Sequence, residues 1–235
     1  MNLFVHIRFY YSAFIISFIV SIMIPLLYFF PKKKSLILHY SNKTMLALLF
    51  AKVTTVGNLD EKAQLYLVNH QGIVDIITLE ALLNKNLNWV AKKELFEVPW
   101  FGLLLKNGEM ISVDREDGRG LIKLLRDVKH SVEKLHRPVA IFPEGTRAKD
   151  QKLLPFKVGA KFIAEKYCMI VQPVVIVGSK SVVNEHEKTS IGGDLKVIYL
   201  PSIDVSNAPK DWYDQLRIDM QKVIDQELEQ YNNKR

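Results

Sequence analysis

An uncharged segment near the N-terminus, residues 9–30, constrains this chain more than any other feature. It is rich in Phe, Tyr and Ile, and a helix of this length would span about 33 Å, enough to cross the roughly 30 Å hydrocarbon core of a bilayer. A cleaved signal peptide is the alternative, but the apolar part is long and no small-residue cleavage pattern precedes the lysines at 32–34. We expect a retained membrane anchor. Pro25 leaves open a kinked hairpin that enters a single leaflet.

Basic residues follow this anchor more densely than they precede it. Three lysines stand at 32–34, with Lys43 and Lys52 further on, against Arg8 before the segment. Because basic flanks favour the cytoplasmic side, we expect the rest of the chain on the cytoplasmic face of a membrane, the inner one in a bacterium. Residues 36–53 mix apolar side chains with lysines. They form either an amphipathic helix on the membrane surface or an ordinary helix packed on the domain.

Beyond residue 57, short apolar segments typical of buried strands alternate with helical patterns. The predicted strands are 65–68, 89–91, 110–113, 139–142, 169–177 and 195–200. The predicted helices are 120–137, 157–167 and a C-terminal one that includes 212–224. This alternation predicts an α/β fold with a mostly parallel sheet flanked by helices and functional loops at the strand ends. We therefore divide the chain into an N-terminal anchor with its amphipathic segment, 1–57, and one globular domain, 58–235.

The net charge and the cysteine count limit the classes of ligand and metal that this chain can be expected to bind. A formal net charge of +7 and a pI of about 9.3 suit an acidic membrane surface, a phosphorylated substrate or a nucleic acid. No aromatic-basic recognition motif accompanies the charge, so no nucleic-acid partner is expected. The single cysteine, Cys168, cannot form an internal disulfide, and the chain has no H-x-x-x-H or H-E-x-x-H pattern. We therefore expect no metal site.

The sequence NHQGIVD, residues 69–75, directly follows the predicted strand 65–68. Neutral His70 can take up a proton at cellular pH, and Asp75 can hold the imidazole in one tautomer and stabilise the imidazolium. The two together would form a general base that activates a hydroxyl of the substrate. On spacing alone, a loop histidine with a solvated neighbour is the commoner explanation.

A second motif, FPEGTR at residues 142–147, follows the predicted strand 139–142. Pro and Gly favour a fixed turn at the strand end, and this turn would project Glu144, Thr146 and Arg147. The planar guanidinium of Arg147 suits a phosphate monoester. Taken alone, the motif is explained equally well as a turn with a solvated arginine that pairs with Glu144.

Polar groups follow four predicted strands in succession. Besides the two motifs, Lys92 follows the strand 89–91 and Arg115 follows the strand 110–113. Each has an ordinary explanation as a solvated charge or an ion pair. In a mostly parallel sheet, however, the carboxyl ends of the strands meet at one edge, where ligands bind. The combination therefore predicts a site that each motif alone would not.

These blocks, in this order, resemble the glycerolipid acyltransferases of the 1-acylglycerol-3-phosphate (lysophosphatidate) acyltransferase type. That family shows N-H-x4-D, a G…D-R block, F-P-E-G-T-R and a V-P-[VI] block. The corresponding sequences here are NHQGIVD at 69–75, GEMISVDR at 108–115, FPEGTR at 142–147 and VQPV at 171–174. The resemblance runs from about residue 60 to 180. Gln172 and Ser112 depart from it, since the family commonly has apolar residues there.

The resemblance implies a function for the domain 58–235. His70, assisted by Asp75, would deprotonate the free sn-2 hydroxyl of 1-acylglycerol 3-phosphate. The oxygen would attack an acyl thioester of coenzyme A or acyl carrier protein, giving phosphatidate for phospholipid synthesis. The resemblance implies that Arg115, Arg147 and Lys92 hold the substrate phosphate, and that Glu144, Gly145 and Thr146 shape this substrate-binding pocket. Membrane phospholipids would be the surroundings, and no cofactor besides the thioester co-substrate is expected.

Other functions fit parts of the pattern. A related acyltransferase would use the same two residues on glycerol 3-phosphate or another lysolipid. A membrane-bound thioesterase would use His70 to activate water, although two arginines placed for an anionic acceptor argue against hydrolysis. A basic binding module without catalysis would leave the histidine and the aspartate unexplained.

Overall fold

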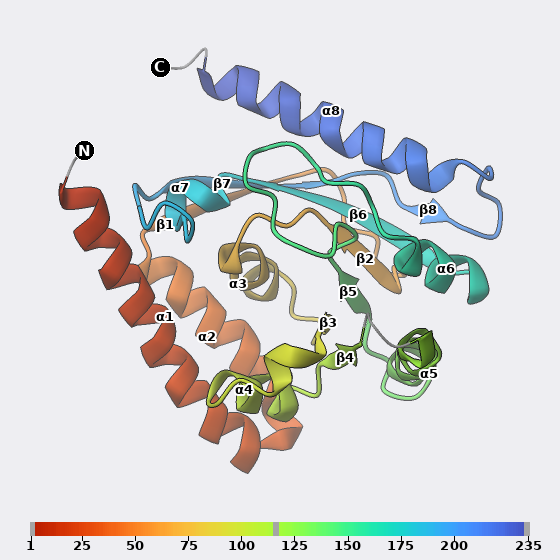
Figure 1. Cartoon of the computed structure of the whole chain (residues 1–235), viewed down its shortest axis with the longest axis horizontal. Helices are drawn as coiled ribbons and strands as arrows, with labels where there is room; N and C mark the ends of the chain where they lie inside the picture. The colour runs from red at the N-terminus through yellow and green to blue at the C-terminus, as the bar shows by residue number, and fades with distance from the viewer. Residues whose placement is uncertain (1–2, 115–117, 233–235) are drawn as a thin grey trace.

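The computed structural model describes residues 3–114 and 118–232 (Figure 1). One sheet organises the chain, with the strand order β1-β7-β6-β2-β5-β3-β4, and β8 pairs with β6. The strands are β1 Ala51–Val56, β2 Leu65–Val68, β3 Asn88–Lys92, β4 Ile111–Val113, β5 Val139–Ile141, β6 Ile170–Val177, β7 Gly193–Tyr199 and β8 Ile203–Asp204. The helices are α1 Leu3–Phe29, α2 Lys34–Leu48, α3 Ile73–Leu82, α4 Phe101–Asn107, α5 Gly118–Glu133, α6 Val158–Lys166, α7 Ser179–Val182 and α8 Trp212–Asn232, with short 3₁₀ turns η1 Pro31–Lys33 and η2 Lys93–Phe96.

The predicted α/β fold with a mostly parallel sheet is confirmed. Strands β6, β2, β5, β3 and β4 run parallel to one another. Strand β7 is antiparallel to β6, and β1 is parallel to β7. The carboxyl ends of five strands therefore lie along one edge of the sheet, together with the starts of β7 and β1.

The central strands carry apolar side chains on both of their faces, and helices cover both faces of the sheet. In β2, Leu65 and Leu67 pack in a cluster with residues of α5, α6 and α8. Tyr66 and Val68 pack on the other side with Leu79 of α3. Successive side chains of a strand point to opposite faces, so this four-residue strand is buried on both. Figure 1 shows α8 on one side of the sheet and α1 and α2 on the other.

Residues 36–53 depart from the expected single helix. Helix α2 ends at Leu48, and residues 51–56 form β1. Phe50 has a φ of 54°, which breaks the helix, and β1 then pairs with β7 from Ala51 opposite Gly193. The helix prediction is thus right up to Leu48 and wrong beyond it. The division at residue 57 stays a prediction, although β1, which precedes it, is hydrogen-bonded into the sheet.

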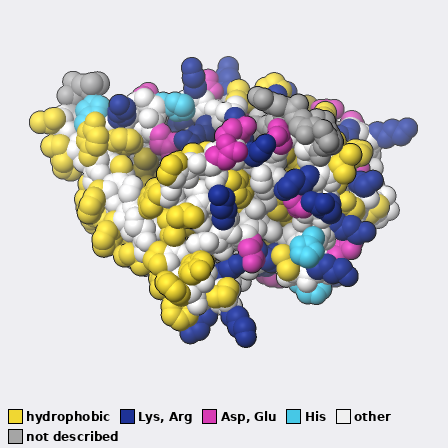
Figure 2. All heavy atoms as spheres, turned by 60° about the horizontal axis from the view of Figure 1, so that its bottom comes forward, with side chains coloured by type: hydrophobic (Ala, Val, Ile, Leu, Met, Phe, Trp, Pro, Cys, Tyr) yellow, Lys and Arg dark blue, Asp and Glu magenta, His cyan; other side chains and the backbone are white. Residues whose placement is uncertain are grey.

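Helix α1 is long and apolar enough to cross a membrane, yet it packs along the domain. Near its start, the Ser190 N–H donates to the Val5 carbonyl at 3.0 Å. Near its end, Asn107 Nδ2 donates to the carbonyl of Ile24 at 3.1 Å. Its opposite side leaves large apolar side chains exposed, namely Leu3, Phe4, Ile7, Tyr10, Phe14, Phe18 and Ile22. Figure 2 shows apolar side chains gathered on one side of the face in view and basic ones more frequent on the other.

Candidate active site

The carboxyl edge of the sheet brings together most of the residues that the sequence singled out. His70 follows β2, Lys92 ends β3 with an exposed side chain, and the loop with Glu144 and Arg147 follows β5. Arg115 lies outside the described residues. The edge therefore carries a histidine, carboxylates and cations on adjacent strands, as expected for a ligand site in a sheet of this kind.

His70 and Asp75 are hydrogen-bonded. His70 Nδ1 lies 3.1 Å from Asp75 Oδ2, and the carboxylate is fully buried while the imidazole is 13% exposed. Because an ionised carboxylate can only accept, Nδ1 carries the proton and Nε2 is left as an acceptor. The arrangement can therefore take a proton from a bound hydroxyl.

The position of Asp75 follows from local structure. It is the third residue of α3, and its Oδ2 also accepts the backbone N–H groups of Gln71 at 2.6 Å and Gly72 at 2.9 Å. A carboxylate in the first turn satisfies N–H groups that the helix leaves without partners and faces the positive end of the helix dipole. These bonds fix the carboxylate before any substrate binds.

Asn69 fixes the histidine from the other side. Its side chain forms two bonds with the backbone of Ile176, donating from Nδ2 at 2.9 Å and accepting at Oδ1 at 2.7 Å. The pair continues the β2–β6 hydrogen bonding beyond Val68. His70 thus leaves the sheet from a braced backbone rather than from a loose loop.

Glu144, which we expect to shape the substrate pocket, is buried and bonded to the backbone of two segments. Its Oε1 accepts the His70 N–H at 2.9 Å and its Oε2 accepts the Leu154 N–H at 2.8 Å. Burial raises the pKa of its carboxyl, and these two backbone bonds act in the opposite direction. A carboxylate occupied in this way is suited to bracing His70 and poorly suited to contacting a phosphate.

The neighbouring residues of the motif have different roles. Gly145 has a φ of +73°, a left-handed conformation that favours glycine, and its N–H donates to the Phe142 carbonyl at 3.0 Å. Thr146 is exposed. The Ala148 N–H donates to the His70 carbonyl at 2.9 Å, which ties this loop to the histidine.

Arg147 pairs with Glu185 rather than with Glu144. Its side chain is 43% exposed and contacts Glu185 Oε2 through Nη1. Glu185 Oε1 accepts the N–H of Ile73, the first residue of α3, at 3.1 Å. The contact with Glu185 involves one of the five guanidinium donors.

Sequence reasoning missed Glu185 and a second residue, Lys180. Lys180 Nζ donates to the Ala148 carbonyl at 2.7 Å and to the Lys149 carbonyl. Burial lowers the pKa of Lys180, and carboxylates such as Asp150 act in the opposite direction. Both missed residues follow β6 and carry no motif. The signal available in the sequence was the general one, that the loop after another parallel strand reaches the same edge.

Gln172, a departure from the family pattern, lies inside the fold. It is fully buried, its Nε2 donates to the Leu200 carbonyl at 2.6 Å, and its Oε1 accepts the Asp60 N–H at 2.8 Å. It therefore satisfies loop backbone groups that an apolar residue would leave without partners.

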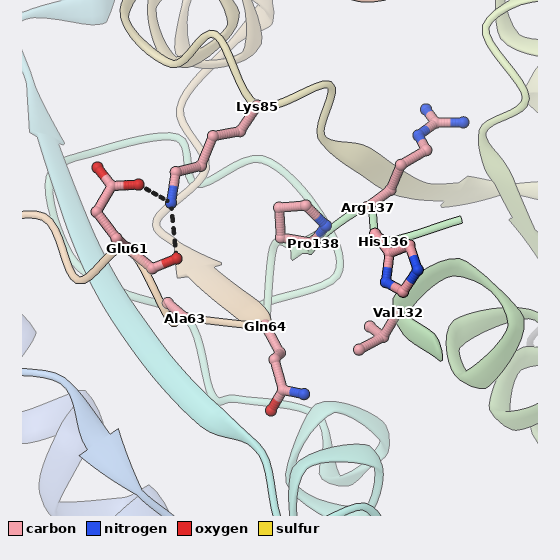
Figure 3. A pocket seen from close by; sticks show the side chains of 8 residues that line it. All are labelled: Glu61, Ala63, Gln64, Lys85, Val132, His136, Arg137 and Pro138. Carbon is pink, nitrogen blue, oxygen red and sulfur yellow. Dashed lines mark hydrogen bonds and ion pairs between the residues drawn. The ribbon is translucent and has the colours of Figure 1, made fainter. Parts of the chain in front are cut away.

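A cavity of about 410 Å³ lies at the opposite edge of the sheet (Figure 3). Gln64 and Pro138, which line it, directly precede β2 and β5. Lys85 Nζ pairs across it with Glu61 at 2.6 Å. Among the predicted site residues that the structure describes, none lines this cavity, so it is separate from the His70–Asp75 site.

Comparisons with known proteins agree with this geometry. A family model described as Acyltransferase matches residues 51–177. The chain is 36% identical over 222 residues to the 1-acyl-sn-glycerol-3-phosphate acyltransferase of Helicobacter pylori, which covers 92% of each chain. It is 29% identical over 164 residues to the protein of the same name from Escherichia coli, covering 70% of this chain and 66% of that one.

A solved structure shares the fold. The crystal structure of the 1-acyl-sn-glycerophosphate (LPA) acyltransferase PlsC from Thermotoga maritima covers 98% of this chain and 96% of that one, with a TM-score of 0.73 at 22% identity. At that identity the likeness supports the fold alone. The family model over residues 51–177 and the relative at 36% identity show that this chain belongs to the acyltransferase family.

Proposed function

We propose that this enzyme transfers an acyl group from an acyl thioester to the free sn-2 hydroxyl of 1-acylglycerol 3-phosphate, giving phosphatidate. The names of its relatives support this acceptor. The observation that carries the mechanism is the His70–Asp75 hydrogen bond at the carboxyl edge of the sheet.

In the proposed mechanism, Nε2 of His70 takes the hydroxyl proton while Asp75 stabilises the imidazolium. The hydroxyl oxygen attacks the thioester carbonyl, and the tetrahedral intermediate collapses as the carbon–sulfur bond breaks. The imidazolium returns its proton to the leaving thiolate. The acyl group passes directly to the acceptor, so no serine or cysteine of the enzyme has to carry it, and no cofactor takes part besides the thioester of coenzyme A or acyl carrier protein.

The phosphate of the acceptor would bind beside the dyad formed by His70 and Asp75. Arg147 supports the proposal because its side chain is partly exposed, lies on the loop bonded to His70 and is held in place by Glu185. Lys92 ends a nearby strand with an exposed ammonium group. Arg115 is proposed from the sequence alone.

Membrane attachment would bring the enzyme to its lipid substrate. The exposed apolar side of α1 is continued by Trp100, whose Nε1 donates to Ser21 Oγ at 3.0 Å, and by Leu103. Both ends of α1 contact the domain, which supports a helix embedded by one side in a single leaflet over one that crosses the bilayer. The lysines that follow α1 suit the anionic lipids of a cytoplasmic leaflet.

One assay tests this function. Purified protein is given lysophosphatidate with acyl-coenzyme A or acyl carrier protein thioester, and phosphatidate and free thiol are followed together. The proposal requires equal amounts of both products. Thiol release without phosphatidate would indicate a thioesterase, and faster acylation of glycerol 3-phosphate or another lysolipid would indicate a related acyltransferase.

A further inference from the structure

The proposed mechanism of His70 and Asp75 leaves one buried carboxyl group of the neighbouring core without a role. Glu80, on α3, is 2% exposed. Its Oε1 accepts a hydrogen bond from the indole Nε1 of Trp89, on β3, at 2.7 Å. A buried ionisable side chain costs stability unless it has partners. Its presence in the core therefore calls for an explanation beyond packing.

The indole of Trp89 begins a column of stacked rings that ends at His70. Trp89 stacks on Phe142 with a centroid separation of 5.0 Å and an interplanar angle of 28°. Phe142 in turn stacks on the imidazole of His70 at 3.7 Å and 12°. The column joins β3 and the loops after β5 and β2, and Glu80 connects it to α3. It connects a buried carboxyl group to the face of the proposed general base.

The column restrains a motion of His70 that Asp75 leaves free. The Asp75 bond holds Nδ1 at one point in the ring plane. It does not by itself prevent the ring from tilting about that point. The nearly parallel ring of Phe142 defines the plane of the imidazole and thus the direction of Nε2. Small misplacements of a catalytic group lower the rate steeply, because reacting atoms must meet at about 3 Å in a defined direction.

The surroundings of Glu80 influence the charge of its carboxyl group and fix its backbone. Burial raises its pKa to about 7, opposed by the Trp89 hydrogen bond and the charge of Arg137. The guanidinium of Arg137 is itself bonded to the Leu87 carbonyl at 3.3 Å and paired with Glu109 at 3.2 Å. His39 of α2 contacts the Glu80 backbone carbonyl at 3.3 Å. With either charge state, an oxygen of Glu80 can accept the indole N–H.

We propose that Glu80 is a positioning residue for acyl transfer: by fixing the indole of Trp89 it holds Phe142 against His70 and sets the plane of the imidazole. The inference rests on the proposed function, in which His70 is the general base. Glu80 touches neither substrate nor reacting atoms, so its effect belongs to turnover and not to acceptor binding.

The test uses the full-length protein in detergent or vesicles with lysophosphatidate and acyl-coenzyme A. Glu80→Met removes the acceptor oxygen at similar volume, and Trp89→Phe removes the donor but keeps a ring. Each should lower kcat about ten- to a hundredfold and change the acceptor KM less than twofold. Glu80→Gln keeps an acceptor oxygen and should retain kcat within about threefold. The double variant Glu80→Met, Trp89→Phe should lose no more than the worse single one.

A matched control comes from the far side of the sheet. Trp212 Nε1 donates to Glu165 Oε1 at 3.1 Å, the same kind of pair with no contact to His70. Trp212→Phe should therefore leave kcat unchanged, even where it lowers the melting temperature as much as Trp89→Phe does. Equal losses of kcat in the two Trp→Phe variants would assign the effect to general destabilisation and overturn the inference.

Other results also decide. Full kcat in Glu80→Met and Trp89→Phe would disprove the positioning role of Glu80. If His70→Ala is inactive in the same assay, the proposed function is still supported. An active His70→Ala would instead remove the base on which the inference rests. A loss in Glu80→Gln as large as in Glu80→Met would show that the charge of Glu80 matters, not its hydrogen bond. If Glu80→Met does not fold, the comparison of Trp89→Phe with Trp212→Phe remains decisive.

Discussion

Arg147 and Glu185 form an ion pair that joins the loop after β5 to the start of α3, because the same carboxylate accepts the Ile73 N–H. Helix α3 carries Asp75, so the proposed phosphate ligand and the dyad share one support. The segment with Glu185 is also tied to α1, since His6 Nδ1 contacts the Lys188 carbonyl at 2.8 Å. Helix α1 is thereby connected to the edge of the sheet that carries His70 and Asp75.

Glu185→Ala should weaken both connections. It removes the acceptor for a helix N-terminus, which typically costs about 0.5–2 kcal/mol, and it releases Arg147, which should raise the KM for lysophosphatidate. Glu185→Gln keeps an acceptor oxygen and should recover most of the stability. Thermal unfolding and acceptor kinetics on the same preparations separate the two effects. If Glu185→Ala changes neither the thermal stability nor the KM for lysophosphatidate, the contacts of Glu185 with Arg147 and Ile73 have no role in solution.

His70→Ala and Asp75→Ala should both abolish acyl transfer while the protein still folds and reaches the membrane. General-base catalysis contributes about 10²–10⁴-fold, and orientation of the base can matter comparably. Phosphatidate formation at saturating substrate measures the loss, and circular dichroism checks the fold. Near-full activity of His70→Ala would rule out the mechanism.

Arg147→Ala should raise the acceptor KM more than it lowers kcat, provided that the phosphate contact is equally strong in the ground and transition states. Arg147→Lys should restore only part of the acceptor affinity, because the planar guanidinium with its paired donors is replaced by the point charge of an ammonium group. Arg126→Ala is the control, since Arg126 is exposed on α5 and is also paired with a carboxylate, that of Asp127. Arg115→Ala and Lys92→Ala test the other proposed ligands. If Arg147→Ala and Arg115→Ala both keep normal kinetics, the phosphate binds elsewhere, with Lys92 the next candidate.

Replacing exposed apolar residues of α1 should release the protein from membranes without unfolding it. The triple variant Phe14→Ser, Phe18→Ser, Ile22→Ser alters the exposed side and leaves the buried one intact. Sedimentation with vesicles after a high-salt wash measures attachment. Activity on a short-chain soluble lysophosphatidate should survive better than activity on a bilayer substrate. Phe162→Ser on α6, also exposed, is the control, and complete retention of the triple variant on vesicles would contradict an anchor role for this side of α1.

Glu80→Gln should stabilise the protein more at pH 8 than at pH 5. Burial raises the pKa of Glu80 from 4.5 to about 7, so the folded state holds its proton more tightly than the unfolded state does. The stability that this proton contributes is fully present below about pH 4.5 and is lost as the pH rises through about 7. A glutamine does not titrate and lacks this pH dependence. At pH 8, the free energy of unfolding of Glu80→Gln should therefore exceed that of the unmodified protein by up to about 3 kcal/mol more than at low pH. Chemical unfolding of both proteins at the two pH values measures it, with Glu165→Gln as the control; a gain that does not grow with pH would contradict the raised pKa.

Local pattern was enough for much of the fold and for the dyad. The strand 65–68 was predicted to the residue and the helix 157–167 to within one residue at each end, because hydrophobic periodicity is a short-range property. His70 and Asp75 are five positions apart, so the turn into α3 can bring them together through local structure. That α3 begins at Ile73 was not predicted, since its apolar residues face two neighbours and lack a clean helical stripe.

Tertiary structure decided the remainder. Residues 51–56 are a strand because they pair with β7, some 140 positions away, and no local pattern contains that partner. The same holds for the contacts of Glu185 with Arg147 and of the Trp89 ring with the Phe142 ring. By itself the sequence determined which chemical groups stand at the ends of strands. Which of them touch was decided by the order of strands in the sheet, because side-chain contacts at 3 Å depend on long-range pairing that spacing along the chain does not specify.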